Sequence, residues 1–162
     1  MAHVLDLCRS LDERRLQPNE TLLVEGEPSP GALYILAEGS LQVLKGDVEI
    51  AVVSEPGAFF GEMSLLLDVP FSATVRALEP SRCFVATDGQ GFLENTAGAN
   101  LAVARLLARR LHMASSYLAD LKRQYEGSDT GLAVVDEVLE ALTHHHESAA
   151  DCEPGSDRDP NY

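Results

Sequence analysis

The chain has 162 residues, 45% of them hydrophobic, and a formal charge of −14. This size and apolar content suffice for one core, and no apolar run approaches the about 20 residues that a membrane-spanning helix needs. The acidic excess disfavours nucleic acid and anionic membrane surfaces, so neither is an expected partner.

The N-terminal segment carries charged residues where a secretion signal needs an apolar stretch. We therefore expect a cytoplasmic protein. Its three cysteines, Cys8, Cys83 and Cys152, lie far apart and lack the spacing of metal ligands. In a cytoplasmic chain this arrangement predicts free thiols.

Short strands separated by turn signals are expected over residues 21–86. Alternating apolar patterns at 41–43 and 48–52 flank the turn-forming Lys45-Gly46-Asp47, which predicts a β-hairpin. Two further strands are expected at 73–78 and 81–86. The segment as a whole predicts a small all-β roll or jelly roll, with helices after it.

The segment 60–75, F-G-E-M-S-L-L-L-D-V-P-F-S-A-T-V, carries the most informative motif. A short helix that opens at Gly61-Glu62 exposes free backbone N–H groups, and glycine lets a ligand approach the backbone closely. Such a turn can hold an anion with one phosphodiester charge. The structural alternative is that Gly61 serves a tight turn and Glu62 caps the helix.

This segment resembles the phosphate-binding cassette of cyclic-nucleotide-binding domains, which occur in catabolite-activator-type bacterial regulators, cyclic-nucleotide-dependent kinases and gated channels. The resemblance covers about residues 20–126. It implies a mainly β fold with flanking helices: a cyclic-nucleotide-binding-type β-roll (jelly roll) followed by a long C-terminal dimerisation helix. It also implies that Glu62 accepts hydrogen bonds from a ribose hydroxyl. The ligand-binding residues carried over from the family are Gly61, Glu62, Met63, Ser64, Phe71, Ser72, Ala73 and Ser115.

One residue departs from the family pattern. In the family an arginine follows the proline and clamps the phosphate, whereas here Phe71 follows Pro70. A phenylalanine cannot form this bidentate pair, so we expect weakened binding of cyclic AMP. Arg76 is not expected to compensate, because five residues further along an extended strand it faces the opposite side.

Two alternatives follow from this departure. In the first, Phe71 plugs the former phosphate pocket and the chain is a non-sensing protein-interaction module. In the second, the domain senses a different ligand, such as a cyclic dinucleotide.

The region 104–125 has the strongest helical periodicity. Apolar residues recur at alternating spacings of three and four, which is a heptad pattern and predicts a homodimer through this helix. The alternative is that the helix lies on the roll, although a second apolar stripe could serve that purpose. In the resembling bacterial regulators this helix forms the homodimer and meets the nucleotide base, near Ser115. The heptad residues are Ala104, Leu107, Leu111, Ala114, Leu118, Leu121 and Tyr125, and the second stripe is Val103, Leu106, Met113 and Tyr117.

The remaining sequence predicts a short accessory helix at 127–147 and a disordered acidic tail at 148–162, after a domain that spans 1–126. Many of the resembling bacterial regulators carry a DNA-binding winged helix-turn-helix after the long helix, and these two segments are too short to form one. We therefore expect a standalone regulatory or signalling module that acts on an unknown protein partner.

An enzymatic function is not expected. A jelly-roll metal enzyme would need several histidines on its strands, but all five histidines lie outside 21–86. No serine or cysteine nucleophile with a nearby base is evident either. We expect no catalytic residue, no metal and no cofactor, with a cyclic nucleotide as the possible ligand.

Overall fold

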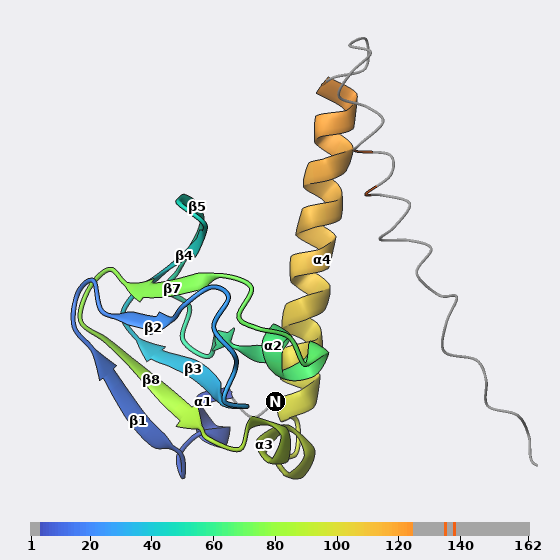
Figure 1. The fold of residues 1–162 in the computed structure, drawn as a ribbon. Coiled ribbons are helices and arrows are strands. Elements are labelled where there is room, and N and C mark those ends of the chain that lie inside the picture. Colours follow the sequence, from blue (N-terminus) through green and yellow to red (C-terminus); the bar gives the residue numbers. More distant parts are fainter. Residues whose placement is uncertain (1–3, 125–134, 136–137, 139–162) are drawn as a thin grey trace, which may run out of the picture. The chain divides into compact units, whose positions relative to one another are not determined.

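The computed structural model describes residues 4–124, together with 135 and 138. These residues form two four-stranded antiparallel sheets and four helices (Figure 1). The elements in chain order are α1 (Val4–Leu7), β1 (Asp12–Leu16), β2 (Thr21–Leu23), β3 (Leu33–Glu38), β4 (Leu41–Lys45), β5 (Val48–Val53), β6 (Phe59–Phe60), α2 (Glu62–Leu67), β7 (Thr74–Ala77), β8 (Ser81–Ala86), α3 (Gly89–Asn95) and α4 (Ala99–Gln124).

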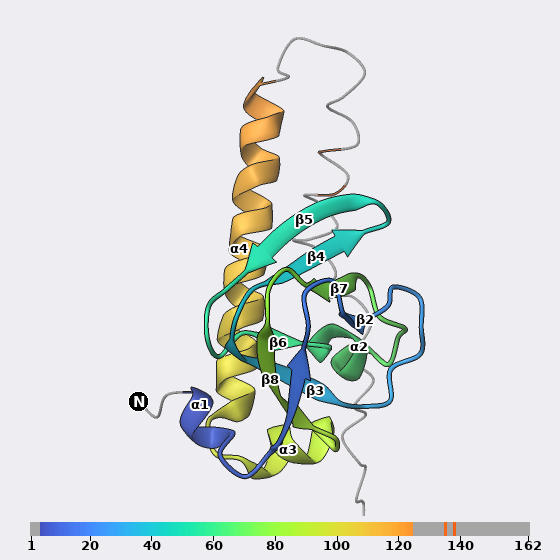
Figure 2. The same cartoon turned by 90° about the vertical axis from the view of Figure 1, so that its left-hand side faces the viewer.

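One sheet has the strand order β1-β8-β3-β6 and the other has the order β2-β7-β4-β5. The predicted hairpin is confirmed, since β4 and β5 pair in antiparallel fashion at the edge of the second sheet (Figure 2). The strands predicted near 73–78 and 81–86 are confirmed as β7 and β8. The predicted β-roll with a long helix after it is therefore the observed fold.

The roll begins earlier than predicted. Its first strand is β1, which pairs with β8 from Asp12↔Val85 to Leu16↔Ser81. The sequence of β1, D-E-R-R-L, lacks an alternating apolar pattern because only Leu16 is buried. The expected start at residue 21 was therefore wrong by one strand.

The interior of the roll is an apolar cluster to which both sheets contribute. Leu16 comes from β1, Tyr34 and Leu36 from β3, and Val75 from β7, while Phe71 precedes β7. All of these side chains are at most 9% exposed. Burial of this apolar surface, at about 25 cal/mol per Å², is the main force that closes the roll.

A second cluster lies between the outer side of β3 and the helices. Leu33 and Ile35 point to it, whereas Tyr34 and Leu36 point to the interior of the roll, as the alternation of a strand requires. Val103 of α4 is 2% exposed in this cluster, and Leu106 and Leu107 pack against it. Leu106 belongs to the second stripe and Leu107 to the heptad. In this part of α4, residues of both patterns therefore pack against the second cluster.

By contacts between residues, the chain divides into two compact units, 1–107 and 108–162. Within the second unit, α4 continues to Gln124, with Leu111, Met113 and Tyr117 exposed on its surface. Tyr125, the acidic tail and all of the predicted accessory helix except residues 135 and 138 lie outside the described residues. No helix in the described part of the chain is long and apolar enough to cross a membrane.

Cys8 and Cys83 are free and fully buried, one in each apolar cluster. Burial raises the pKa of both thiols to about 11. The prediction of free thiols is confirmed for these two residues, while Cys152 lies outside the described residues.

Candidate functional site

The cassette begins where β6 turns into α2, a helix of six residues. The turn residue, Gly61, has a φ of +85°, which strongly favours glycine. A Cβ atom added there would lie 3.1 Å from the carbonyl oxygen of Ala32. Both the turn and the close approach of Ala32, the residue before β3, therefore favour glycine at this position.

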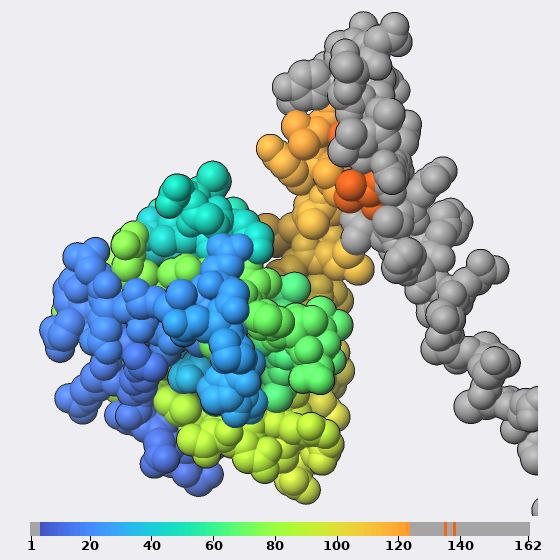
Figure 3. Space-filling view, viewed as in Figure 1, coloured from blue at the N-terminus to red at the C-terminus, as the bar shows by residue number. Residues whose placement is uncertain are grey.

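The first turn of α2 has two buried polar side chains. Glu62 is 3% exposed and Ser64 is 4% exposed, whereas Met63 between them is 40% exposed. The Ser64 hydroxyl donates to the carbonyl oxygen of Pro70 at 3.2 Å, which ties the helix to the end of the cassette loop. Figure 3 shows the surface of α2 in green on the outside of the domain, where Leu66 and Leu67 are also exposed.

Backbone hydrogen bonds hold Phe71 against the loop after β2. Its N–H donates to the carbonyl oxygen of Glu27 at 2.9 Å, and its carbonyl oxygen accepts from the N–H of Gly26 at 2.8 Å. The side chain is 7% exposed and belongs to the interior cluster of the roll.

The ring of Phe71 lies directly beside the Gly61 turn. Its nearest carbon is 3.7 Å from the position of a Cβ on Gly61, and the ring of Tyr34 is 3.8 Å from the same position. The residue in place of the family's arginine thus points inward and surrounds the turn with aromatic carbon. This environment favours an apolar group over a phosphate.

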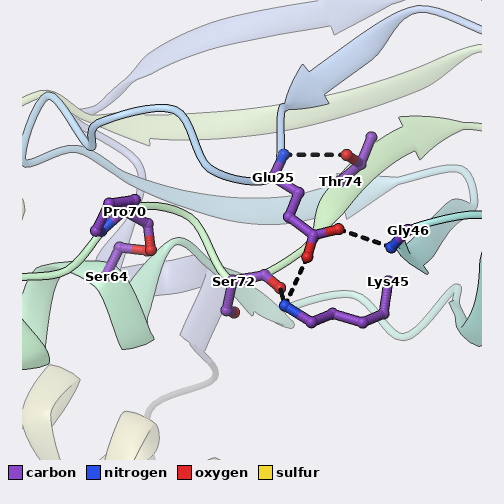
Figure 4. A network of polar contacts seen from close by, with 7 residues as sticks. All are labelled: Glu25, Lys45, Gly46, Ser64, Pro70, Ser72 and Thr74. Atoms are coloured by element: carbon purple, nitrogen blue, oxygen red, sulfur yellow. Dashed lines mark hydrogen bonds and ion pairs between the residues drawn. The ribbon is translucent and has the colours of Figure 1, made fainter.

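After Phe71 the cassette returns to the surface. Ser72 is exposed, and Ala73 is half-buried. The carbonyl oxygen of Ser72 accepts a hydrogen bond of 2.6 Å from the ammonium of Lys45, at the end of β4 (Figure 4). The cassette is therefore in direct contact with a cation from a different part of the sheet.

Glu25 completes this polar network. One of its carboxylate oxygens lies 2.6 Å from the Lys45 ammonium, and the other accepts from the N–H of Gly46 at 2.7 Å. Its own N–H donates to the Thr74 hydroxyl at 3.0 Å. The hydrogen bond from Lys45, followed by that from Gly46, lowers the pKa of Glu25.

Arg76 lies on the opposite side of β7 from the interior. Val75 and Ala77 are buried, and Arg76 between them donates to the Gln42 side chain at 2.9 Å. This agrees with the prediction that Arg76 faces away from the site. The contact of Lys45 with the cassette was not predicted, because in the sequence Lys45 stands out only as part of a turn.

The predicted site residues from Gly61 to Ala73 thus form one continuous cassette. Ser115 lies on α4 in the second unit, where it is half-buried. Its contact with a nucleotide base stays a prediction.

Comparisons with known proteins identify the family. A model of the cyclic nucleotide-binding domain matches residues 13–93, half of the chain, and the protein belongs to this family. This match includes the whole cassette. It confirms the resemblance inferred from the motif at 60–75.

Two relatives are cGMP-dependent protein kinases. The kinase of Plasmodium berghei is 41% identical over 70 residues, which cover 43% of this chain and 8% of the kinase. The kinase of Eimeria tenella is 35% identical over 92 residues, covering 57% of this chain and 9% of the kinase. This chain therefore spans about a tenth or less of these two relatives.

Among solved structures, the catabolite activator protein of Thermus thermophilus superposes with a TM-score of 0.60 at 26% identity. The superposition covers 88% of this chain and 84% of that protein. The likeness therefore extends over most of both chains.

Proposed function

We propose that this cyclic-nucleotide-binding domain is a regulatory module that binds its nucleotide weakly and is not itself an enzyme. The observation that carries the proposal is Phe71, buried beside the Gly61 turn in a cassette that otherwise keeps the family pattern. The family resemblance assigns the backbone of the turn to the phosphate and the Glu62 carboxyl to the ribose.

The expected loss of affinity follows from the missing guanidinium. A hydrogen bond to a charged group contributes about 1.5–3 kcal/mol, so its absence weakens binding by roughly tenfold to a hundredfold. We therefore expect a dissociation constant for cyclic AMP in the high micromolar range or weaker.

We expect the effect of ligand binding to be transmitted through the helix at 104–125 and through contacts with a partner protein. We expect a cytoplasmic homodimer through residues 104–125, in which ligand binding shifts the balance between two packings of the helix. The exposed Leu111 supports this proposal, because a large apolar side chain on the heptad is left without cover in the single chain. A further protein partner would receive the signal.

Titration of the purified protein with cyclic AMP, cyclic GMP and cyclic di-GMP tests the function. Weak but saturable binding of a cyclic mononucleotide is the expected result, and Phe71→Arg should strengthen it at least tenfold. Phe71→Leu is the matched control, since it opens the same position without adding a charge. Equal affinities of the Arg and Leu variants would refute the role given to position 71.

The burial of Phe71 also favours a second candidate, a protein-interaction module whose phosphate pocket is plugged. In that case neither the wild type nor Phe71→Arg binds a cyclic mononucleotide. Binding of cyclic di-GMP alone would indicate instead that the domain has changed its ligand.

A further inference from the structure

The segment of the chain that contains the cassette has few basic residues. Between Gln17 and Pro80 the sequence contains two basic residues, Lys45 and Arg76. Arg76 is bonded to Gln42 on the outer face of its sheet. In the other sheet, Arg14 of β1 donates to the carbonyl oxygen of Thr21, and Arg82 of β8 lies 2.6 Å from a carboxylate oxygen of Glu13.

The alternation of β4 determines on which side of the strand Lys45 lies. Leu41 pairs with Ala77 and Val43 pairs with Val75, and these side chains face the interior cluster. The pairing with β7 keeps this register as far as Leu44, whereas the pairing with β5 shifts after Val43. Alternation along β4 puts Lys45, its last residue, on the same side as Leu41 and Val43. Lys45 is thus an exposed cation at the rim of the roll, on the side from which its ammonium reaches the cassette.

The ammonium of Lys45 is already held next to the cassette. It contacts the Ser72 carbonyl oxygen and a Glu25 carboxylate oxygen, both at 2.6 Å. An ammonium group has three donors, so one donor remains beyond these two contacts. The side chain is 58% exposed, so an anion can reach it from solvent.

From this geometry we propose that Lys45 is the cation that pairs with the phosphate of the bound cyclic nucleotide, and that Glu25 holds it in position at the cassette. The proposal rests on the proposed function, because it needs a cyclic nucleotide in the cassette. Lys45 offers a point charge from the β4–β5 hairpin in place of a bidentate fork from the cassette itself. It would therefore supply attraction with less geometric selectivity than the family's arginine.

Glu25 has two opposing effects in this arrangement. Its bonds to Lys45 and Gly46 fix the end of the hairpin, while its negative charge offsets the positive charge that the phosphate meets. A glutamine at position 25 keeps an oxygen that can accept a hydrogen bond from Lys45 and removes the negative charge, so Glu25→Gln should strengthen anion binding. A purely structural role of the ion pair predicts the reverse, because a loosened hairpin would not bind better.

The test measures the affinity for cyclic AMP by NMR titration, which reaches millimolar dissociation constants. We expect Lys45→Met to weaken binding roughly tenfold and Glu25→Gln to strengthen it a few-fold. Lys45→Arg keeps the charge and should keep most of the affinity. Arg76→Met removes the same charge from the outer face, so it should change the affinity less than about twofold.

Two further measurements separate binding from folding. The affinity of Lys45→Met should depend less on salt concentration than that of the wild type, which a merely structural role would not produce. In the Phe71→Arg variant the introduced arginine pairs with the phosphate. Adding Lys45→Met to that variant should therefore raise the dissociation constant by a smaller factor than Lys45→Met does in the wild type.

If Lys45→Met and Arg76→Met weaken binding equally, or Glu25→Gln weakens it, this inference is overturned while the proposed function stands. If neither the wild type nor Phe71→Arg binds a cyclic nucleotide, the proposed function fails, and the role of Lys45 fails with it.

Discussion

Leu111 on α4 gives the sharpest test of the proposed homodimer. It is 49% exposed, and it belongs to the predicted heptad. Met113 is 69% exposed and lies two residues on, which is roughly 200° around the helix. Leu111→Asp and Met113→Asp therefore add the same charge to opposite sides of one helix, and only the first should affect the dimer.

The size of the effect follows from the exposed half of the leucine. Complete burial of a leucine side chain stabilises by about 1.5–3 kcal/mol, so covering the exposed half contributes about 1 kcal/mol per copy. A symmetric dimer contains two copies, and the loss of about 2 kcal/mol corresponds to roughly thirtyfold in the dimer dissociation constant. An unpaired carboxylate in the interface adds several kcal/mol more, which takes the effect beyond roughly a thousandfold.

Light scattering over a concentration series is the assay. We expect a dimeric wild type, a monomeric Leu111→Asp and a dimeric Met113→Asp, with equal circular dichroism because both positions are exposed within the single chain. A wild type that stays monomeric at every concentration would refute the dimer. Dissociation of both variants to the same extent would show that general charge repulsion, and not the heptad, is responsible.

Two predictions concern the stability of the roll. Gly39 has a φ of +94°, and an added Cβ would lie 2.7 Å from the Cα of Ser81, so Gly39→Ala should lower the free energy of unfolding in urea by several kcal/mol. Gly46, with a φ of +56° and nothing within 4 Å, is the control, and Gly46→Ala should cost only about 1 kcal/mol; equal losses would contradict the steric argument. Because the pKa of Glu25 is lowered in the folded state, its contribution to stability is present above the carboxyl's ordinary pKa and is lost as the pH falls through the lowered value. Urea unfolding over acidic pH should therefore show a smaller decline for Glu25→Gln than for the wild type, and identical pH profiles would rule out this contribution.

Much of the fold could be predicted because its signals are local. The hairpin of β4 and β5 follows from alternation around a turn, and the cassette follows from a motif within sixteen consecutive positions, 60–75. The strand β1 could not be predicted in this way. It is held by its pairing with β8, about seventy residues away, and its own residues are mostly exposed.

The candidate site was predictable to the same extent. The motif located the Gly61 turn and the substitution at Phe71, and the alternation of β7 placed Arg76 outside. The contact between Lys45 and Ser72 depends on the pairing of β4 with β7, which no local pattern indicates. One signal was nevertheless available, because alternation from Leu41 and Val43 puts Lys45 on the same side of the strand as these two residues.

Position 71 faces the interior of the roll. Its side chain can therefore either pack in the apolar cluster or pair with a bound phosphate, but not both. An arginine in this place would leave a charged group to be desolvated whenever the ligand is absent, and the arrival of a phosphate would offset that cost. Phe71 instead completes the apolar cluster of the roll. It contributes burial to the cassette and no charge that a phosphate could pair with. Under the proposed function, the larger electrostatic change on binding then occurs at Lys45 and Glu25, at the end of the β4–β5 hairpin.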